Sequence, residues 1–316
     1  MDIVAVDIGG THARFAIATL SAGGIALGAE TVLRTSDYAG LAEAWQAFGA
    51  QAGRALPDCA SVAIAAPVEG EAIKLTNNDW MLRPASLAGE LGISALRLVN
   101  DFAAIAHAVS ACSDQLAHIC GPDSPLPHRG IVSIVGPGTG LGVAMLHRHP
   151  AGDHVIPTEG GHIGFAPVDE IDDRILARFR ARVGRVSAER AVSGPGLPDI
   201  YAAVTGDDTP QDERALWQRA LGGQDASAAA ALDRFCGLLG SVAGDLALAQ
   251  GAQAVVIAGG LGLRLAPHLP GSSFAARFAA KGRFKARMEQ LPVKLITHPQ
   301  PGLLGAAAAF AAEHAR

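Results

Sequence analysis

The chain has 316 residues, a formal net charge of −5 at pH 7, 49% hydrophobic residues and 17% charged residues. This length exceeds the size at which one hydrophobic core keeps growing, so two domains are expected. The low charge content excludes long disordered tails. Lysine and arginine are scattered and not clustered in a basic stripe, so nucleic acid is not expected as a partner.

The four cysteines, at positions 59, 112, 120 and 236, form no CxxC pair of the kind that holds zinc. We therefore expect reduced, mostly buried thiols. Met1 and Asp2 lead directly into an apolar run, without the basic and apolar regions of a signal peptide. No apolar run is long enough to span a membrane. We expect a cytoplasmic protein that has no membrane as a partner.

Short apolar runs bounded by turn residues alternate with longer helical patterns. The short runs are typical of buried strands and lie at Ile3–Ile8, Phe15–Thr19, Ser61–Ala65, Leu96–Val99, Ile131–Val135, Val143–Leu146 and Ala254–Ala258. Helices are predicted over Leu41–Arg54, Phe102–Ser110, Ile171–Val183, Ala228–Gln250 and Leu303–Ala312. This alternation predicts an α/β fold.

Two segments repeat one pattern of strand, glycine turn and strand. They begin at Val4 and Ile131, roughly 130 residues apart, which is far too long for a solenoid period. The repeat therefore predicts two related lobes, with a nucleotide bound in the cleft between them.

The first glycine turn is predicted to bind phosphate through Asp7, Ile8, Gly9, Gly10 and Thr11. Paired glycines permit positive φ and let backbone N–H groups approach an anion. The threonine adds a hydroxyl donor, and the aspartate suits a hydrated Mg²⁺ ion. A plain hairpin turn is the alternative, but the flanking aspartate and threonine favour phosphate.

The second turn, Gly136–Gly142, lacks the GxGxxG spacing and leads into a strand, so it is not a Rossmann fingerprint. No Lys-Ser or Lys-Thr closes either turn, which excludes a P-loop. Gly138 and Thr139 are predicted as a second phosphate contact. Gly259 and Gly260 follow another strand, where a nucleoside could lie on the backbone, although strand-Gly-Gly is frequent in α/β proteins.

Asn100 and Asp101 follow a predicted strand and precede a predicted helix. Capping of that helix is one interpretation, because both residue types are preferred at N-caps. The other is a ligand site, because ligands bind at the carboxyl ends of strands in open α/β sheets. Asp101 would then accept the proton of an attacking hydroxyl.

Glu159 and His162 are separated by two glycines, which argue against a helix and against a Glu-x-x-His metal site. On a loop, both side chains can face one small polar ligand, and a surface turn is the alternative. Glu189 alone indicates only a favourable charge near a helix N-terminus. Three further histidines are expected in a solvated turn and not at a metal: His147, His149 and His154.

Together these motifs resemble those of the bacterial glucokinase family, within the superfamily of sugar kinases, actin and heat-shock ATPases. The resemblance covers essentially the whole chain and rests on Asp7–Arg14, Thr76–Trp80, Val99–Phe102, Gly138–Gly142, Glu159–His162, Val186–Arg190, Ser193–Leu197, Ile257–Gly260, Lys281–Phe284 and Pro301–Gly305. It implies a two-lobed actin-like ATPase fold of the ribonuclease H-like type, with an interlobe cleft. The expected domains are 1–109 with 302–316, and 110–301.

The resemblance implies that glucose is phosphorylated to glucose 6-phosphate, the first step of glycolysis, with ATP and Mg²⁺. It makes Asp101 the general base. It assigns the sugar to Asn100, Asp101, Glu159, His162 and Glu189, the phosphates to Gly9, Gly10, Thr11, Gly138 and Thr139, and the adenosine to Gly259 and Gly260. It also implies a homodimer.

Two positions depart from the family pattern: Pro137 stiffens the second turn, and Gly164 stands where some relatives carry aspartate. Neither removes a proposed ligand. The cysteine cluster that holds zinc in the broader repressor-and-kinase group is absent, which favours the zinc-free glucokinases.

Three alternatives stay open. One is a kinase for another hexose or an amino sugar. A transcription regulator is disfavoured, since Asp2 and Ile3 begin the first strand and leave no room for a helix-turn-helix extension. An actin-like filament or chaperone ATPase would hydrolyse ATP without sugar.

Overall fold

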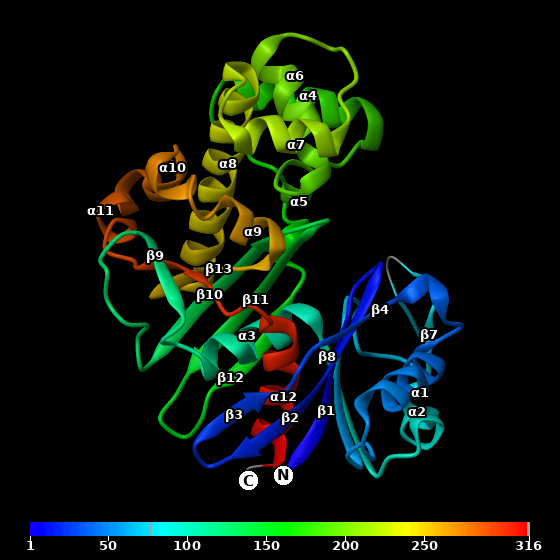
Figure 1. Ribbon diagram of the computed structural model, residues 1–316. Coiled ribbons are helices and arrows are strands. Elements are labelled where there is room, and N and C mark those ends of the chain that lie inside the picture. The colour runs from blue at the N-terminus through cyan, green and yellow to red at the C-terminus, as the bar shows by residue number, and fades with distance from the viewer. Residues whose placement is uncertain (76–77, 315–316) are drawn as a thin grey trace. The chain divides into compact units, whose positions relative to one another are not determined.

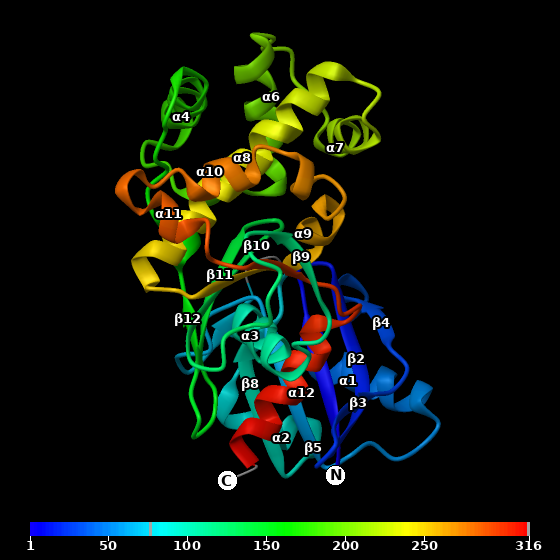
Figure 2. The same cartoon turned by 90° about the vertical axis from the view of Figure 1, so that its left-hand side faces the viewer.

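A computed structural model describes residues 1–75 and 78–314 (Figures 1 and 2). Thr76 and Asn77, in the predicted motif Thr76–Trp80, lie outside the described residues. The chain forms two compact units, Met1–Asp114 with His298–Arg316 and Gln115–Thr297. The mixed order of strands and helices confirms the predicted α/β class.

The first unit is built on a six-stranded sheet in the order β3-β2-β1-β5-β8, with β4 also paired to β2. The strands are β1 (Asp2–Ile8), β2 (His12–Ser21), β3 (Gly24–Leu27), β4 (Thr31–Arg34), β5 (Cys59–Ile64) and β8 (Ala95–Asn100). A separate hairpin joins β6 (Ile73–Lys74) to β7 (Met81–Leu82). β1, β5 and β8 are parallel, so Ile8, Ile64 and Asn100 lie in register at the carboxyl ends of these three strands.

Helices cover both faces of this sheet (Figure 1). One side carries α1 (Leu41–Ala52) and α2 (Pro84–Leu91), and the other carries α3 (Asp101–Ala111) and α12 (Pro301–His314); η1 (Thr35–Asp37) is a 3₁₀ turn. Helix α12 is apolar on all sides, as a buried helix requires. At Gly305 a Cβ atom would overlap the carbonyl of Ala104, so glycine permits the close packing of α12 on α3.

The second unit repeats this strand arrangement in the order β12-β11-β10-β13-β14-β9. The strands are β9 (Leu116–Cys120), β10 (Gly130–Pro137), β11 (Leu141–Arg148), β12 (His154–Thr158), β13 (Ala254–Ile257) and β14 (Val293–Ile296). β10 pairs antiparallel with β11 and parallel with β13, as β1 does with β2 and β5. The sequence repeat therefore corresponds to equivalent hairpins in two sheets of related topology.

A long buried helix organises the rest of this unit. The α-helices are α4 (Glu170–Val183), α5 (Ala188–Ala191), α6 (Leu197–Thr205), α7 (Glu213–Gly222), α8 (Ala226–Gln250), α9 (Gly259–Leu265), α10 (Phe274–Ala279) and α11 (Lys285–Met288). The 3₁₀ turns are η2 (Gly160–His162), η3 (Gly194–Gly196), η4 (Leu269–Gly271) and η5 (Gly282–Phe284). Gly240 and Gly244 let α10 pack directly on α8 (Figure 2), since a Cβ at either would overlap α10 backbone.

Each predicted strand and helix is present, with ends that shift by a few residues. The helix predicted over Leu41–Arg54 ends at Ala52, because Gly53 adopts the left-handed conformation with φ of 66°. The prediction of a solvated turn was wrong for two histidines: His147 lies in β11 and His154 in β12, paired across the hairpin with ring centroids 6.3 Å apart.

Two of the four cysteines, Cys112 and Cys236, are buried, whereas Cys59 and Cys120 are half-buried, so burial is less general than predicted. Burial raises the pKa of the Cys236 thiol to about 12. Within residues 1–75 and 78–314, no helix is long and apolar enough to cross a membrane.

Candidate active site

The first glycine turn connects β1 to β2 at the carboxyl end of β1. The Gly9 N–H donates to the carbonyl of His12 at 2.9 Å and closes the turn. Neither Gly9 nor Gly10 is among the described glycines with positive φ, so the turn does not use the left-handed backbone that paired glycines permit. The Thr11 side chain is exposed and lies 3.0 Å from His12 Nδ1.

Two side chains that were not predicted as site residues contact this turn. Thr35 Oγ1 donates to the Gly10 carbonyl at 3.0 Å. Asn78 Nδ2 donates to the Gly9 carbonyl at 3.3 Å. Asn78 belongs to a recognised motif, but Thr35 carries no sequence signal, because its contact depends on the pairing of β4 with β2.

Asp7 lies one residue before the end of β1, with its side chain 22% exposed. A Cβ at Gly302, in the first turn of α12, would overlap the Asp7 carboxylate, so glycine makes room for it. Arg14 Nη1 is 3.7 Å away and its Nε is 3.3 Å from Glu30. Burial raises the pKa of Asp7, and the charge of Arg14 partly opposes that rise. A desolvated carboxylate of this kind suits a cation.

Asn100 caps α3, so the capping interpretation holds for this residue. Its Oδ1 accepts from the backbone N–H groups of Phe102 at 3.0 Å and Ala103 at 3.1 Å. Its Nδ2 donates to Asp101 Oδ1 at 3.0 Å, and that oxygen also accepts from Phe102 N at 2.9 Å. The cap therefore fixes the Asp101 carboxylate as well as starting the helix.

The first turn and Asp101 both lie at the carboxyl ends of the parallel strands of the first sheet. Ile8 pairs in register with Ile64, and Ile64 pairs with Asn100. Neighbouring strands lie about 4.8 Å apart, so the ends of β1 and β8 are separated by roughly 10 Å. A span of that size accommodates a phosphoryl group beside a hydroxyl-bearing ligand.

The second glycine turn joins β10 to β11 at the equivalent place in the second unit. Gly138 N donates to the Gly140 carbonyl at 2.8 Å, while the Gly138 carbonyl accepts from Gly194 N at 2.8 Å. Thr139 is exposed, as Thr11 is in the first turn. Gly259 has φ of 81°, and a Cβ there would lie 2.9 Å from the Pro137 carbonyl. The third glycine run, whose Gly259 and Gly260 begin α9, therefore lies against the second turn.

Glu159, His162 and Glu189 form one cluster in the second unit. His162 Nε2 lies 3.7 Å from Glu159 Oε2, and His162 Nδ1 lies 4.0 Å from Glu189 Oε1. The two glycines between Glu159 and His162 serve close packing on β11: a Cβ at Gly160 would lie 2.8 Å from Val143 Cγ1, and one at Gly161 would overlap a β11 carbonyl. Close packing on β11 therefore accounts for both glycines.

Glu189 also contacts the second glycine turn. Its Oε2 accepts from Leu141 N at 3.0 Å. A Cβ at Gly140 would lie only 2.5 Å from the same oxygen, so the carboxylate occupies the space that glycine leaves. One carboxylate therefore belongs to both the polar cluster and the turn, a link that the sequence does not reveal.

The predicted residues fall into two groups, one in each unit. The first unit brings together Asp7, Ile8, Gly9, Gly10, Thr11, Asn100 and Asp101 at one sheet edge. The second brings together Gly138, Thr139, Gly259, Gly260, Glu159, His162 and Glu189.

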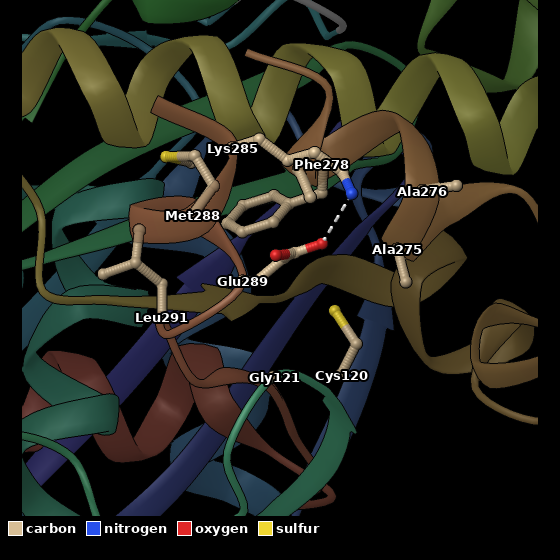
Figure 3. A pocket seen from close by; sticks show the side chains of 10 residues that line it. Cys120, Gly121, Ala275, Ala276, Phe278, Lys285, Met288, Glu289 and Leu291 are labelled. Carbon is tan, nitrogen blue, oxygen red and sulfur yellow. Dashed lines mark ion pairs between the residues drawn. The ribbon is translucent and has the colours of Figure 1, made fainter. Parts of the chain in front are cut away.

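A separate cavity of about 380 Å³ lies in the second unit between β9, α10 and α11 (Figure 3). Phe278, Met288 and Leu291 line it, and an ion pair of 3.0 Å joins Lys285 to Glu289 beside it. None of the candidate site residues lines this cavity.

Comparison with known proteins gives consistent matches along the whole chain. The family model described as Glucokinase matches residues 4–313. The glucokinase of Zymomonas mobilis subsp. mobilis is 58% identical over 317 residues, which cover 98% of each chain. The solved glucokinase from an Antarctic psychrotroph has a TM-score of 0.85 at 33% identity and 98% coverage of each chain. A ROK family glucokinase from Streptomyces griseus, solved with glucose and AMPPNP, shares the fold with a TM-score of 0.66 at 19% identity, covering 98% of this chain and 99% of its own.

Proposed function

The chain belongs to the glucokinase family, and from this premise we propose that it transfers a phosphoryl group from ATP to the 6-hydroxyl of glucose. The product is glucose 6-phosphate. The observation that carries this proposal is the 58% identity to a glucokinase over 98% of both chains. The fold is the two-lobed actin-like ATPase fold of that family.

Asp101 acts as the general base in this proposal. Asn100 Nδ2 and Phe102 N both donate to its Oδ1, which holds the carboxylate in one orientation. A positioned base of this kind contributes about 10²- to 10⁴-fold to a rate. Asp101 takes the proton of the sugar 6-hydroxyl as that oxygen attacks the terminal phosphorus of ATP.

The two glycine turns hold the phosphates. Phosphoryl transfer passes through a loose transition state, so the protein chiefly aligns the reactants and neutralises charge. Backbone N–H groups and the hydroxyls of Thr11 and Thr139 supply hydrogen-bond donors without bulky side chains. Gly259 and Gly260 lie beside the adenosine, since this run packs on the second turn.

Asp7 is the residue that would hold Mg²⁺, most of whose ligands would be water and phosphate oxygens. Its desolvated carboxylate, with an Arg14 nitrogen no closer than 3.7 Å, fits a divalent cation. When bound, the ion neutralises negative charge on the phosphates.

Glu159, His162 and Glu189 bind the sugar hydroxyls, together with Asn100 and Asp101. The proposal keeps the domain bounds that the resemblance implies, a small domain of 1–109 with 302–316 and a large domain of 110–301. The proposal also includes a homodimer in the cytoplasm. A kinase of the same fold that prefers another hexose or an amino sugar is the alternative.

A coupled assay of ADP release tests this proposal. We expect the highest kcat/KM with glucose and lower values with mannose, fructose and N-acetylglucosamine. A higher kcat/KM with one of the other sugars would reassign the substrate. Equal ADP release with and without sugar would indicate an ATPase and contradict the proposal.

A further inference from the structure

Three consecutive carbonyl groups of the first glycine turn are occupied by donors from outside the turn. The Gly9 carbonyl accepts from Asn78 Nδ2 at 3.3 Å. The Gly10 carbonyl accepts from Thr35 Oγ1 at 3.0 Å, and the Thr11 carbonyl accepts from Thr35 N at 3.1 Å. The whole turn is therefore anchored through its acceptors.

Anchored carbonyls orient the N–H groups of the turn. In a planar trans peptide the C=O and the following N–H point in opposite directions. Fixing the carbonyls of Gly9 and Gly10 therefore fixes the N–H groups of Gly10 and Thr11 on the opposite side. Neither N–H is among the backbone donors bonded to another backbone group in the described part of the chain, so both are available to a ligand of the turn.

The two anchoring side chains are themselves held in place. Thr35 is 5% exposed and donates with both its hydroxyl and its backbone N–H. Asn78 Oδ1 accepts from Trp80 N at 2.8 Å, which leaves Nδ2 to face the turn. Trp80 is buried, and its Nε1 donates to the Tyr38 carbonyl at 3.0 Å. The anchors are built into the surrounding fold.

We propose that Thr35 and Asn78 are positioning residues for ATP, which hold the Gly9–Thr11 turn with its N–H groups toward the phosphates. The inference rests on the proposed function, in which this turn binds ATP. Neither residue belongs to the predicted sugar group. Loss of either anchor should therefore weaken ATP binding without a matching loss of glucose binding.

Isosteric variants test the proposal through the KM values for the two substrates. Thr35→Val removes the hydroxyl donor and Asn78→Asp removes the amide donor, while each keeps the side-chain shape. We expect each to raise KM for ATP about fivefold, as loss of one hydrogen bond implies, with KM for glucose within twofold. Thr35→Ser, which keeps the donor, should restore KM for ATP to within twofold of the wild type.

Thr19→Val is a matched control, because it removes one hydroxyl bond, to Asp2 at 2.8 Å, away from the turn. It should leave both KM values unchanged. If Thr35→Val does not fold, Asn78→Asp decides the matter alone. Equal increases in both KM values, or an ATP KM within twofold of the wild type for the anchor variants, would overturn the positioning role.

Thr11→Ala separates this role from the proposed function. If Thr11→Ala raises KM for ATP while the anchor variants do not, the turn binds phosphate and only the positioning role is wrong. If none of these variants changes KM for ATP, the turn is not the phosphate site, so the positioning role and the phosphate assignment of this turn are both wrong. ADP release with and without glucose tests the proposed kinase activity separately.

Discussion

A single added methyl group at Gly140 tests the link between the sugar group and the second turn. The Cβ of Gly140→Ala would lie 2.5 Å from Glu189 Oε2 and 3.2 Å from its Cδ. Gly140 is not among the described glycines with positive φ, so alanine adopts this backbone without strain. The effect of the substitution therefore falls on the Glu189 carboxylate.

The expected magnitude follows from the displaced hydrogen bond. Non-bonded carbon and oxygen atoms approach to about 3.5 Å, so the carboxylate must move by about 1 Å. That shift breaks its bond to Leu141 N, now 3.0 Å, and alters its 4.0 Å approach to His162. A hydrogen bond to a charged group is worth about 1.5 to 3 kcal/mol. We expect kcat/KM for glucose to fall about 10- to 150-fold.

Steady-state ADP release at saturating ATP, with glucose varied, measures this effect. Gly89→Ala in α2 is the matched control, because a Cβ there meets nothing within 4 Å, and it should leave kcat/KM unchanged. If kcat/KM for glucose falls by less than about threefold in Gly140→Ala, the role of Glu189 in glucose binding does not depend on this contact. Thermal melting of both variants checks that neither result comes from unfolding.

Three further predictions follow from the site and the core. Asp101→Asn should lower kcat by about 10²- to 10⁴-fold while calorimetry still detects glucose binding; near wild-type turnover would remove Asp101 as the base. Gly302→Ala should displace the Asp7 carboxylate and raise the Mg²⁺ concentration needed for half-maximal rate; an unchanged Mg²⁺ titration would contradict the assignment. The pKa of Cys236 is raised from 9.0 to about 12, so its stabilising effect is complete below pH 9 and is lost as pH rises toward 12. The melting temperature should fall more steeply over that range in the wild type than in Cys236→Ala, and parallel slopes would refute this.

The main sheets could be predicted because their central strands are continuous apolar runs. Two of the strands that were not predicted, β12 and β14, contain residues that a strand rarely tolerates. β14 contains Lys294, which is buried and pairs with Asp123 at 2.9 Å. β12 contains Pro157, which is accepted because β12 is an edge strand. Such features depend on tertiary neighbours and leave no periodic signal.

The candidate site residues could be identified because they are polar residues and glycines at predicted strand ends. The physical reason why glycine stands at a given position could not be predicted. Gly9 and Gly10 do not use positive φ, whereas Gly259 does, and Gly160 is required by contact with Val143. Conformational freedom and close packing select the same residue, so a sequence alone does not distinguish them.

The contacts that organise the site escaped prediction because they join distant segments. Thr35 reaches the first turn from beyond β4, and Asn78 reaches it from the β6–β7 hairpin. Glu189 meets the second turn through Leu141 N. Each contact consists of only one or two hydrogen bonds between residues far apart in the chain, and no local pattern marks it.

The stoichiometry of ADP and glucose 6-phosphate, measured in one reaction mixture, tests the central claim most directly. A glucokinase should release the two products in a one-to-one ratio, with ADP release close to background when glucose is omitted. ADP formed without sugar at the same rate, or ADP formed with glucose but without glucose 6-phosphate, would contradict phosphoryl transfer to this sugar hydroxyl.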